Sequence, residues 1–156
     1  MSQTLDIYFA TVTGNAEALA GRAQDRAKKA GIPARLINLS QAEAGDLAKG
    51  GVAIFIVSTW GDGDAPDDAQ SFWEAIDAPK APRAENLKYA VFGLGDRGYP
   101  EFNAFAKRLD ERVAELGATR LADRHEADAE YEDDYTAWED RMLPVLAAAL
   151  AQPANA

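Results

Sequence analysis

Three stretches of glycine and small polar residues follow apolar segments of this chain, and they offer hydrogen-bond donors with little side-chain bulk. The first consists of Thr11, Val12, Thr13, Gly14, Asn15 and Ala16, with no lysine or arginine among them. Backbone N–H groups at a helix start point at a bound anion, and the helix dipole favours negative charge there. Gly14 would let the backbone approach such a ligand closely. The stretch indicates either a phosphate site or a capped helix start, with Thr13 or Asn15 as the N-cap.

The first stretch differs from the loops that bind nucleoside triphosphates. The GxxxxGK pattern is absent, and no lysine is placed to contact a β- or γ-phosphate. Neutral donors at a helix start are enough for one terminal phosphate, whereas a triphosphate with Mg²⁺ needs more positive charge nearby. We therefore expect a ligand with a single phosphate ester.

Two further stretches each carry one large aromatic side chain on a glycine-flanked loop. The second contains Ser58, Thr59, Trp60 and Gly61. The third contains Leu94, Gly95, Asp96, Tyr99, Phe102 and Asn103. An exposed aromatic ring beside glycine is unfavourable unless it packs against something. Trp60 and Tyr99 could sandwich a flat ring between them, or they could pack against neighbouring parts of the protein.

Other patterns of this region point to no further cofactor. The glycines at 93, 95 and 98 match the dinucleotide fingerprint, but they follow the fourth predicted strand and not the first. Asp62 and Asp64 resemble the start of a calcium loop, yet Asp67 and Trp73 stand where that loop needs glycine and glutamate. We expect neither a nicotinamide site nor a calcium site.

Catalytic residues are not evident either. The single His125 has no cysteine or nearby histidine with which to share a metal ion, so a surface or partly buried role is expected. Ser58 lacks the GxSxG context of a serine nucleophile. The chain has no cysteine, which excludes disulfides and thiol nucleophiles. We predict no metal site and no catalytic residue.

Hydrophobic patterning predicts alternating strands and helices. Strands are expected at 5–11, 34–39, 52–58, 88–94 and 119–123. Helices are expected at 14–30, at 40–47 with Ser40 as N-cap, from 69 to about 76, at 101–116 and at 132–150. Gly31 and Gly117 are expected to end two of these helices.

This alternation predicts an α/β fold with a five-stranded parallel sheet. The continuous apolar run at 52–58 is typical of a central strand covered on both faces. In open sheets of this class, ligands bind beyond the carboxyl ends of the strands, at the point where strand order reverses. The three glycine-containing stretches follow the first, third and fourth predicted strands, so we expect them to form one site.

Length and charge limit the possible functions. The 156 residues fit one domain, expected over 1–150, with a frayed tail at 151–156. The net charge of −10 makes nucleic acid and anionic membranes poor partners. No apolar run is long enough to span a bilayer, and the first residues do not resemble a signal peptide, so we expect a cytoplasmic protein.

The three stretches together resemble the flavodoxin family. The residues that carry the resemblance are TVTGNAE, STWGDGDAPDDA, FGLGDRGYPEFNAFAK and EYEDDYTAW, in that order. The FMN-binding domains of diflavin reductases, such as cytochrome P450 reductase and sulfite reductase flavoprotein, are the most similar, together with MioC-type flavodoxins and cindoxin. The resemblance implies a three-layer flavodoxin-like sandwich with strand order 2-1-3-4-5 that binds one FMN non-covalently.

The resemblance also assigns roles to residues. Residues 11–16 would hold the phosphate, and residues 58–61 and 94–103 would hold the isoalloxazine ring and the ribityl chain. Trp60 and Tyr99 would stack on opposite faces of the ring. The chain departs from the family at Ala127, where a contacting aspartate is expected, and at Asp96, which replaces an amide.

The resemblance implies an electron carrier. A site without lysine or arginine in an acidic protein would disfavour the anionic reduced flavin and make it a stronger reductant. The expected partners are basic redox proteins, with an NAD(P)H-dependent flavodoxin reductase as donor and a P450, biotin synthase or similar enzyme as acceptor. A rim formed by Asp62, Asp64, Asp67, Asp68, Glu101, Glu132, Asp133 and Asp134 would dock them, although acids at helix starts are also favourable by themselves. We expect a monomer.

Two other functions are alternatives to that of an electron carrier. An FMN-dependent quinone or nitro-compound reductase would need a nicotinamide pocket, for which the sequence gives no sign. A phosphoacceptor domain of the same strand order needs clustered carboxylates after the first strand and a lysine after the fifth. Residues 9–14 contain no carboxylate and the fifth strand ends near Asp123, so we exclude this alternative.

Overall fold

The computed structural model describes residues 4–10, 14–58, 69–95, 104–128 and 130–151. Its strands are β1 (Leu5–Ala10), β2 (Ala34–Asn38), β3 (Gly51–Ser58), β4 (Leu87–Leu94), β5 (Thr119–Arg120) and β6 (His125–Ala127). Its helices are α1 (Asn15–Lys29), α2 (Ala44–Ala48), α3 (Gln70–Asp77), α4 (Ala104–Glu115) and α5 (Glu132–Ala151), with a 3₁₀ turn at Leu39–Gln41. None of the helices within these ranges is long and apolar enough to cross a membrane.

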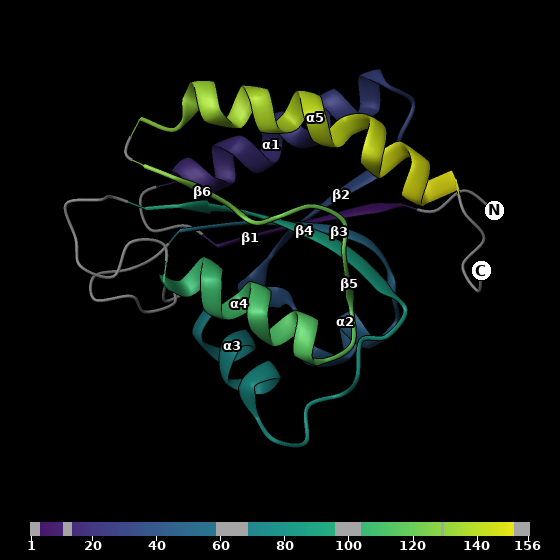
Figure 1. Cartoon of the computed structure of the whole chain (residues 1–156), viewed down its shortest axis with the longest axis vertical. Helices are drawn as coiled ribbons and strands as arrows, with labels where there is room; N and C mark the ends of the chain where they lie inside the picture. Colours follow the sequence, from purple (N-terminus) through teal and green to yellow (C-terminus); the bar gives the residue numbers. More distant parts are fainter. Residues whose placement is uncertain (1–3, 11–13, 59–68, 96–103, 129, 152–156) are drawn as a thin grey trace.

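The strands form one sheet in the order β2-β1-β3-β4-β5, and every pair of neighbours is parallel. This confirms the predicted α/β class and strand order. Helices α1 and α5 cover one face of the sheet, and α2, α3 and α4 cover the other (Figure 1). The result is the expected three-layer sandwich.

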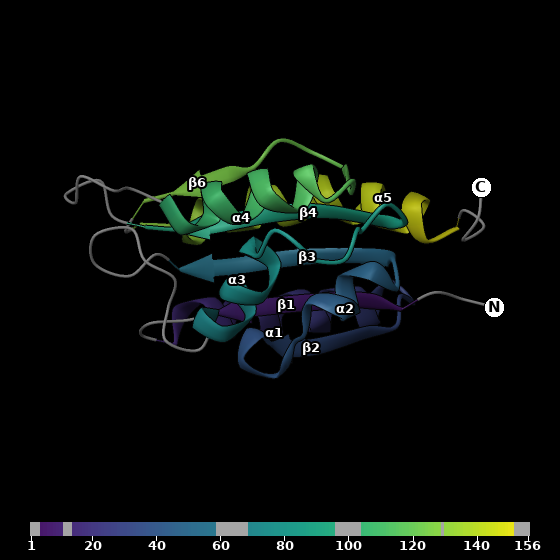
Figure 2. The same ribbon diagram turned by 90° about the horizontal axis from the view of Figure 1, so that it is seen from below.

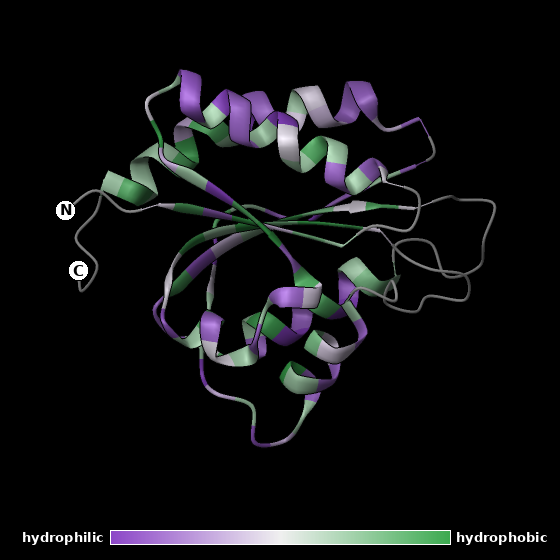
Figure 3. Cartoon of the chain, turned by 180° about the vertical axis from the view of Figure 1, so that it is seen from behind, coloured by the Kyte–Doolittle hydropathy of each residue, from purple (hydrophilic) through white to green (hydrophobic). Residues whose placement is uncertain are grey.

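Each face of the sheet has its own apolar core, because side chains alternate along a strand. Ile54 and Ile56 of β3 pack in the cluster beneath α1 and α5. Phe55 and Val57 pack in the cluster that includes residues of α3 and α4. Seven of the eight residues of β3 are buried, which explains why its sequence is continuously apolar. Figure 3 shows hydrophobic residues along the central strands, with hydrophilic residues on the outer faces of the helices.

Two predicted helix ends are confirmed. Gly31 follows α1 with a φ of +79°, and Gly117 follows α4 with a φ of +104°. Only glycine adopts this left-handed conformation without strain, so it reverses the chain after a helix.

Two predictions about the elements are wrong. Ser40 does not begin the short helix, since α2 starts at Ala44 with Glu43 as N-cap, where Asp46 accepts a hydrogen bond from the Glu43 backbone N–H at 2.9 Å. The predicted strand at 119–123 ends at Arg120, and a sixth strand, β6, pairs with β4 at His125 to Ala127. Between these two strands, only the Leu121 N–H continues the pairing, by donating to the carbonyl oxygen of Tyr89 at 2.7 Å.

Three buried tyrosines predict a loss of stability at high pH. Burial raises the pKa of Tyr8, Tyr89 and Tyr135 above the ordinary value of 10.0, and the nearby carboxylates of Asp6, Asp110 and Glu139 respectively raise it further. The stabilising effect is complete below about pH 10, where tyrosine is neutral in both states, and is lost above it as only the unfolded chain releases these protons.

We expect absorbance at 295 nm to show that these three phenols ionise only when the far-UV circular dichroism collapses. Ionisation of all five tyrosines near pH 10 with the dichroism unchanged would contradict the burial of these side chains.

Candidate cofactor site

The carboxyl ends of four strands lie side by side at one edge of the sheet. Ala10 of β1 is paired with Val57 of β3, and Ser58 of β3 with Leu94 of β4. Leu94 is in turn paired with Ala127 of β6. The chain therefore leaves β1, β3 and β4 at the same edge (Figure 2). As predicted, the three glycine-containing stretches begin together, at the position where open α/β sheets bind ligands.

The start of α1 has the features of an anion site. Gly14 is its N-cap, with a φ of +91°, and no side-chain hydrogen bond caps this end among the described residues. Asn15 is the first helical residue and so is not the N-cap, and Ala16 is fully buried against the core. Within the described residues, no side chain therefore competes with a ligand for the first backbone N–H groups of this 15-residue helix, whose dipole favours an anion.

Ser58 and Gly95 bring polar main-chain and side-chain groups to the same edge. Ser58 ends β3 and is 9% exposed, one of few buried polar residues in the described chain. Gly95 follows β4, and its backbone N–H donates to the carbonyl oxygen of Ala127 at 3.0 Å. Leu94, which precedes Gly95, is buried. The structure thus places the six described members of the predicted site, Gly14, Asn15, Ala16, Ser58, Leu94 and Gly95, along one edge.

The remaining predicted site residues lie outside the described part of the chain. They are Thr11, Val12, Thr13, Thr59, Trp60, Gly61, Asp96, Tyr99, Phe102 and Asn103. Their contacts with a phosphate, ribityl chain or ring stay predictions from the sequence. The same applies to the acidic residues at 62, 64, 67, 68 and 101.

Ala127 has a structural reason for being apolar. Its side chain is fully buried in the cluster beneath α1 and α5, and its carbonyl oxygen accepts the hydrogen bond from Gly95. A carboxylate at this position would be buried among apolar groups, which is strongly unfavourable. The contribution of residue 127 to the edge is its main chain.

His125 is partly buried, as expected from the sequence. Its ring stacks on Phe92 with centroids 5.2 Å apart and an interplanar angle of 6°. Its Nε2 lies 3.4 Å from Oδ2 of Asp134 in the first turn of α5. Nε2 makes no hydrogen bond with the described residues, so the stacking on Phe92 between β6 and β4 is the contact that explains the histidine. The described residues contain no cluster of metal-ligating side chains.

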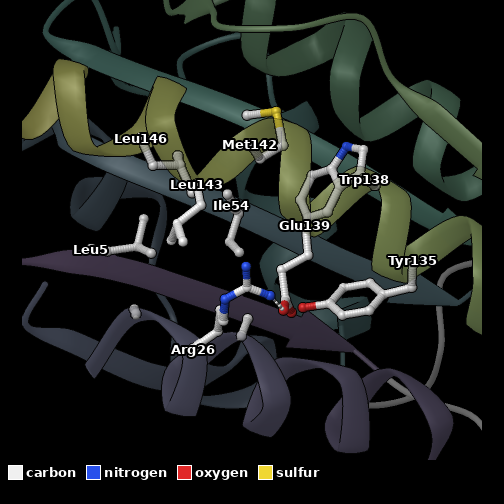
Figure 4. Close-up of a pocket in the computed structure, with 11 residues that line it drawn as sticks. Leu5, Arg26, Ile54, Tyr135, Trp138, Glu139, Met142, Leu143 and Leu146 are labelled. Atoms are coloured by element: carbon white, nitrogen blue, oxygen red, sulfur yellow. Dashed lines mark hydrogen bonds and ion pairs between the residues drawn. The ribbon is translucent and has the colours of Figure 1, made fainter. Parts of the chain in front are cut away.

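A small cavity between α1 and α5 is a second candidate site. Its volume is about 20 Å³, and Tyr135, Trp138, Glu139 and Arg26 contribute to its lining (Figure 4). The Tyr135 hydroxyl, Trp138 Nε1 and Glu139 Oε2 are buried without a hydrogen-bond partner among the described residues. A volume of this size holds roughly one water molecule. Pockets for organic cofactors are larger by at least about tenfold, so this cavity is too small to hold one.

Comparisons with known proteins agree with this geometry. The flavodoxin family profile matches residues 7–138. The chain belongs to the flavodoxin family. The sulfite reductase [NADPH] flavoprotein alpha-component of Vibrio cholerae is 42% identical over 145 residues, which are 93% of this chain and 24% of that protein. The chain therefore spans about a quarter of the length of the curated relatives it matches.

Solved flavodoxin structures share the whole fold. A flavodoxin from Streptococcus pneumoniae TIGR4 superposes with a TM-score of 0.81 at 26% identity, covering 93% of this chain and 98% of the other. Oxidised flavodoxin 1 from Bacillus cereus gives a TM-score of 0.78 at 27% identity, covering 93% and 97%. Membership of this family identifies the chain as an electron-transfer domain whose cofactor is FMN.

The described residues fit this cofactor. The absence of a P-loop lysine predicts a ligand with a single phosphate, and FMN has one. A helix start without a side-chain cap among the described residues suits such a phosphate. At Gly14, no atom of the described residues lies within 4 Å of the position that a Cβ atom would take. The residues that would hold the phosphate are therefore Gly14, Asn15 and Ala16, together with the three residues before them.

Proposed function

We propose that this flavodoxin-family chain carries single electrons on FMN from an NAD(P)H-dependent reductase to an acceptor protein, and has no substrate chemistry of its own. FMN, when bound, supplies the capacity to accept and release electrons. The residues of the chain bind it, orient it and present its edge to partners. The name of the Vibrio cholerae relative, a sulfite reductase [NADPH] flavoprotein, supports NADPH as the original electron source.

One observation carries this proposal. The residues that end the strands at the cofactor edge are Ala10, Ser58, Leu94 and Ala127, and none has a titratable side chain. Three described groups whose pKa is raised, Tyr89, Arg120 and Arg124, are engaged in the contacts around Asp110. The others lie beside Asp6 or Glu139. An oxidoreductase acting on a small substrate needs a group positioned to move a proton. A carrier needs only a bound flavin with an accessible edge.

Acidic residues beside the edge support docking of a basic partner. Glu132, Asp133 and Asp134 form the first turn of α5 and are exposed. This turn follows β6, whose end lies at the cofactor edge. Opposite charges would steer a basic protein towards the flavin, and salt would weaken this steering.

Electron transfer through the chain can be tested with a basic haem protein. FMN-loaded protein, NADPH and a flavodoxin reductase are expected to reduce cytochrome c at a rate that falls steeply with ionic strength, while the chain with NADPH alone shows no turnover. Neutralising the acidic turn (E132Q, D133N, D134N) should lower the low-salt rate by roughly tenfold.

A matched control neutralises three acidic residues at the end of the molecule opposite the cofactor edge, so the net charge changes by the same amount. Asp25, Asp77 and Glu111 are exposed residues in the carboxyl-terminal halves of α1, α3 and α4, and their neutralisation should leave most of the rate intact. Steady oxidation of NADPH by the chain alone, with a quinone or nitro compound as acceptor, would instead identify an enzyme.

A further inference from the structure

The last edge of the sheet contains an insertion of two residues beside β4. In β5, Arg120 is paired with Tyr89, whereas in β6, His125 is paired with Phe92. The offset between partners thus grows from 31 to 33 residues. A bulge of this kind bends the strand and leaves residues outside the ladder. The Leu121 N–H still donates to the carbonyl oxygen of Tyr89 at 2.7 Å, so the main chain from Ala122 to Arg124 is the part that must be held by something other than regular pairing.

A buried carboxylate of α4 holds both sides of this bulge. Asp110 has a side chain that is only 2% exposed. Its Oδ1 accepts hydrogen bonds from the Tyr89 hydroxyl at 2.7 Å and from Arg120 Nε at 2.9 Å. Its Oδ2 accepts one from Arg124 Nη1 at 2.6 Å. One arginine precedes the bulge and the other ends it.

Arg124 connects this carboxylate to β6. Its Nε donates to Oε2 of Glu126 at 2.7 Å, and its side chain is 19% exposed. Because a guanidinium has donors in a fixed planar arrangement, holding two carboxylates at once fixes its orientation. Arg124 therefore ties Glu126 of β6 to Asp110 of α4, whereas Arg120 ties only the short β5.

The two strands lie at opposite ends of β4. β5 is paired with Lys88 and Tyr89, near the amino end. β6 is paired with Phe92, Gly93 and Leu94, at the cofactor edge, and its last residue accepts the hydrogen bond from the Gly95 N–H. A shift of β6 along β4 would therefore displace the main chain of Gly95, but a shift of β5 would not.

We propose that Arg124, held between Asp110 and Glu126, is a positioning residue for the FMN site. It sets the register of β6 after the bulge and thereby places the Ala127 carbonyl group that anchors Gly95. This inference rests on the cofactor edge described above and extends it to a charge network that does not touch the cofactor edge directly. Arg120 provides the comparison, since it contacts the same carboxylate from the strand that does not reach the edge.

The test compares R124M with R120M. Each variant removes one arginine from Asp110, so each should lower the stability of the apoprotein. In R124M, hydrogen exchange of the Gly95 amide in the apoprotein should accelerate by about tenfold relative to amides at the centre of β3, and the FMN dissociation constant should rise by about tenfold. In R120M both quantities should stay within about twofold of the original protein.

Other outcomes overturn the inference. An unchanged Gly95 exchange rate in R124M, or equal changes in the two variants, would show that the network contributes only general stability. If R124M does not fold, R124K provides the test. A lysine keeps the positive charge but lacks the planar set of donors that contacts both carboxylates, so Gly95 exchange and the FMN dissociation constant should shift in the same direction as in R124M. Failure of the original protein to bind FMN would refute the cofactor assignment, and the exchange measurement would still test the register.

Discussion

Replacing Asp110 with alanine is expected to lower the free energy of unfolding of the apoprotein by about 3 kcal/mol, measured by urea denaturation. The substitution leaves the largely buried Arg124 with Glu126 as its remaining carboxylate partner in the described chain. It also removes the closer acceptor of the buried Tyr89 hydroxyl, which then has only the carbonyl oxygen of residue 110, at 3.0 Å. Arg120 is 39% exposed, so its side chain can reorient and be solvated. The expected loss of free energy of unfolding therefore lies at the lower end of the range for breaking a buried ion pair.

Two variants calibrate this result. D110N retains an oxygen that can accept from Tyr89 but lacks the charge, so it should lose less stability than D110A. E85A removes an ion pair of which both side chains are more than half exposed, with Arg83 at 3.5 Å, and should cost less than about 1 kcal/mol. A loss for D110A as small as that for E85A would mean that the network around Asp110 is not formed in solution.

Substitution of Gly14 is expected to weaken FMN binding. The φ of +91° at this position costs an L-residue about 1–2 kcal/mol, so in G14A the free protein should relax away from the conformation that aligns the first N–H groups of α1. Binding must then restore the strained conformation, and the FMN dissociation constant should rise by about tenfold in a fluorescence titration. G14N should recover part of the affinity, because asparagine tolerates left-handed backbone better than alanine.

Gly31 supplies the matched control for Gly14. It has a φ of +79° and, like Gly14, no atom of the described residues within 4 Å of the position of a Cβ atom, but it follows the opposite end of α1. G31A should lose comparable stability while its FMN affinity stays within about twofold. Equal affinities in G14A, G31A and the original protein would argue against the start of α1 as the phosphate site.

The sequence was most informative where local pattern and tertiary structure agree. The apolar run of β3 and the glycines after α1 and α4 could be interpreted without knowledge of the neighbours, and they were placed correctly. The common edge followed from the general rule for parallel sheets, and the register of Ser58 against Leu94 confirms it.

The network around Asp110 could not be predicted in the same way. Residues 119–123 have the composition of one strand. In the structure β5 ends at Arg120 and β6 begins at His125, and this interruption depends on contacts with α4, which lies earlier in the chain. One signal was present: Asp110 stands four residues after the buried Ala106 and so lies on the inner face of α4. A carboxylate at such a position needs cationic partners, but arginines stand at 108, 112, 120 and 124, and only the fold selects the last two.

In this fold, different residues determine the thermal stability of the protein and the properties of the bound flavin. The two apolar clusters lie above and below the sheet and include the strand ends Ala10, Leu94 and Ala127, whereas the segments predicted to hold the cofactor follow these strand ends at the rim. Amino-acid changes in the rim segments can therefore alter the affinity and reduction potential of the flavin while the clusters maintain thermal resistance. Relatives that serve different electron acceptors could in this way diverge at the rim and keep the same interior.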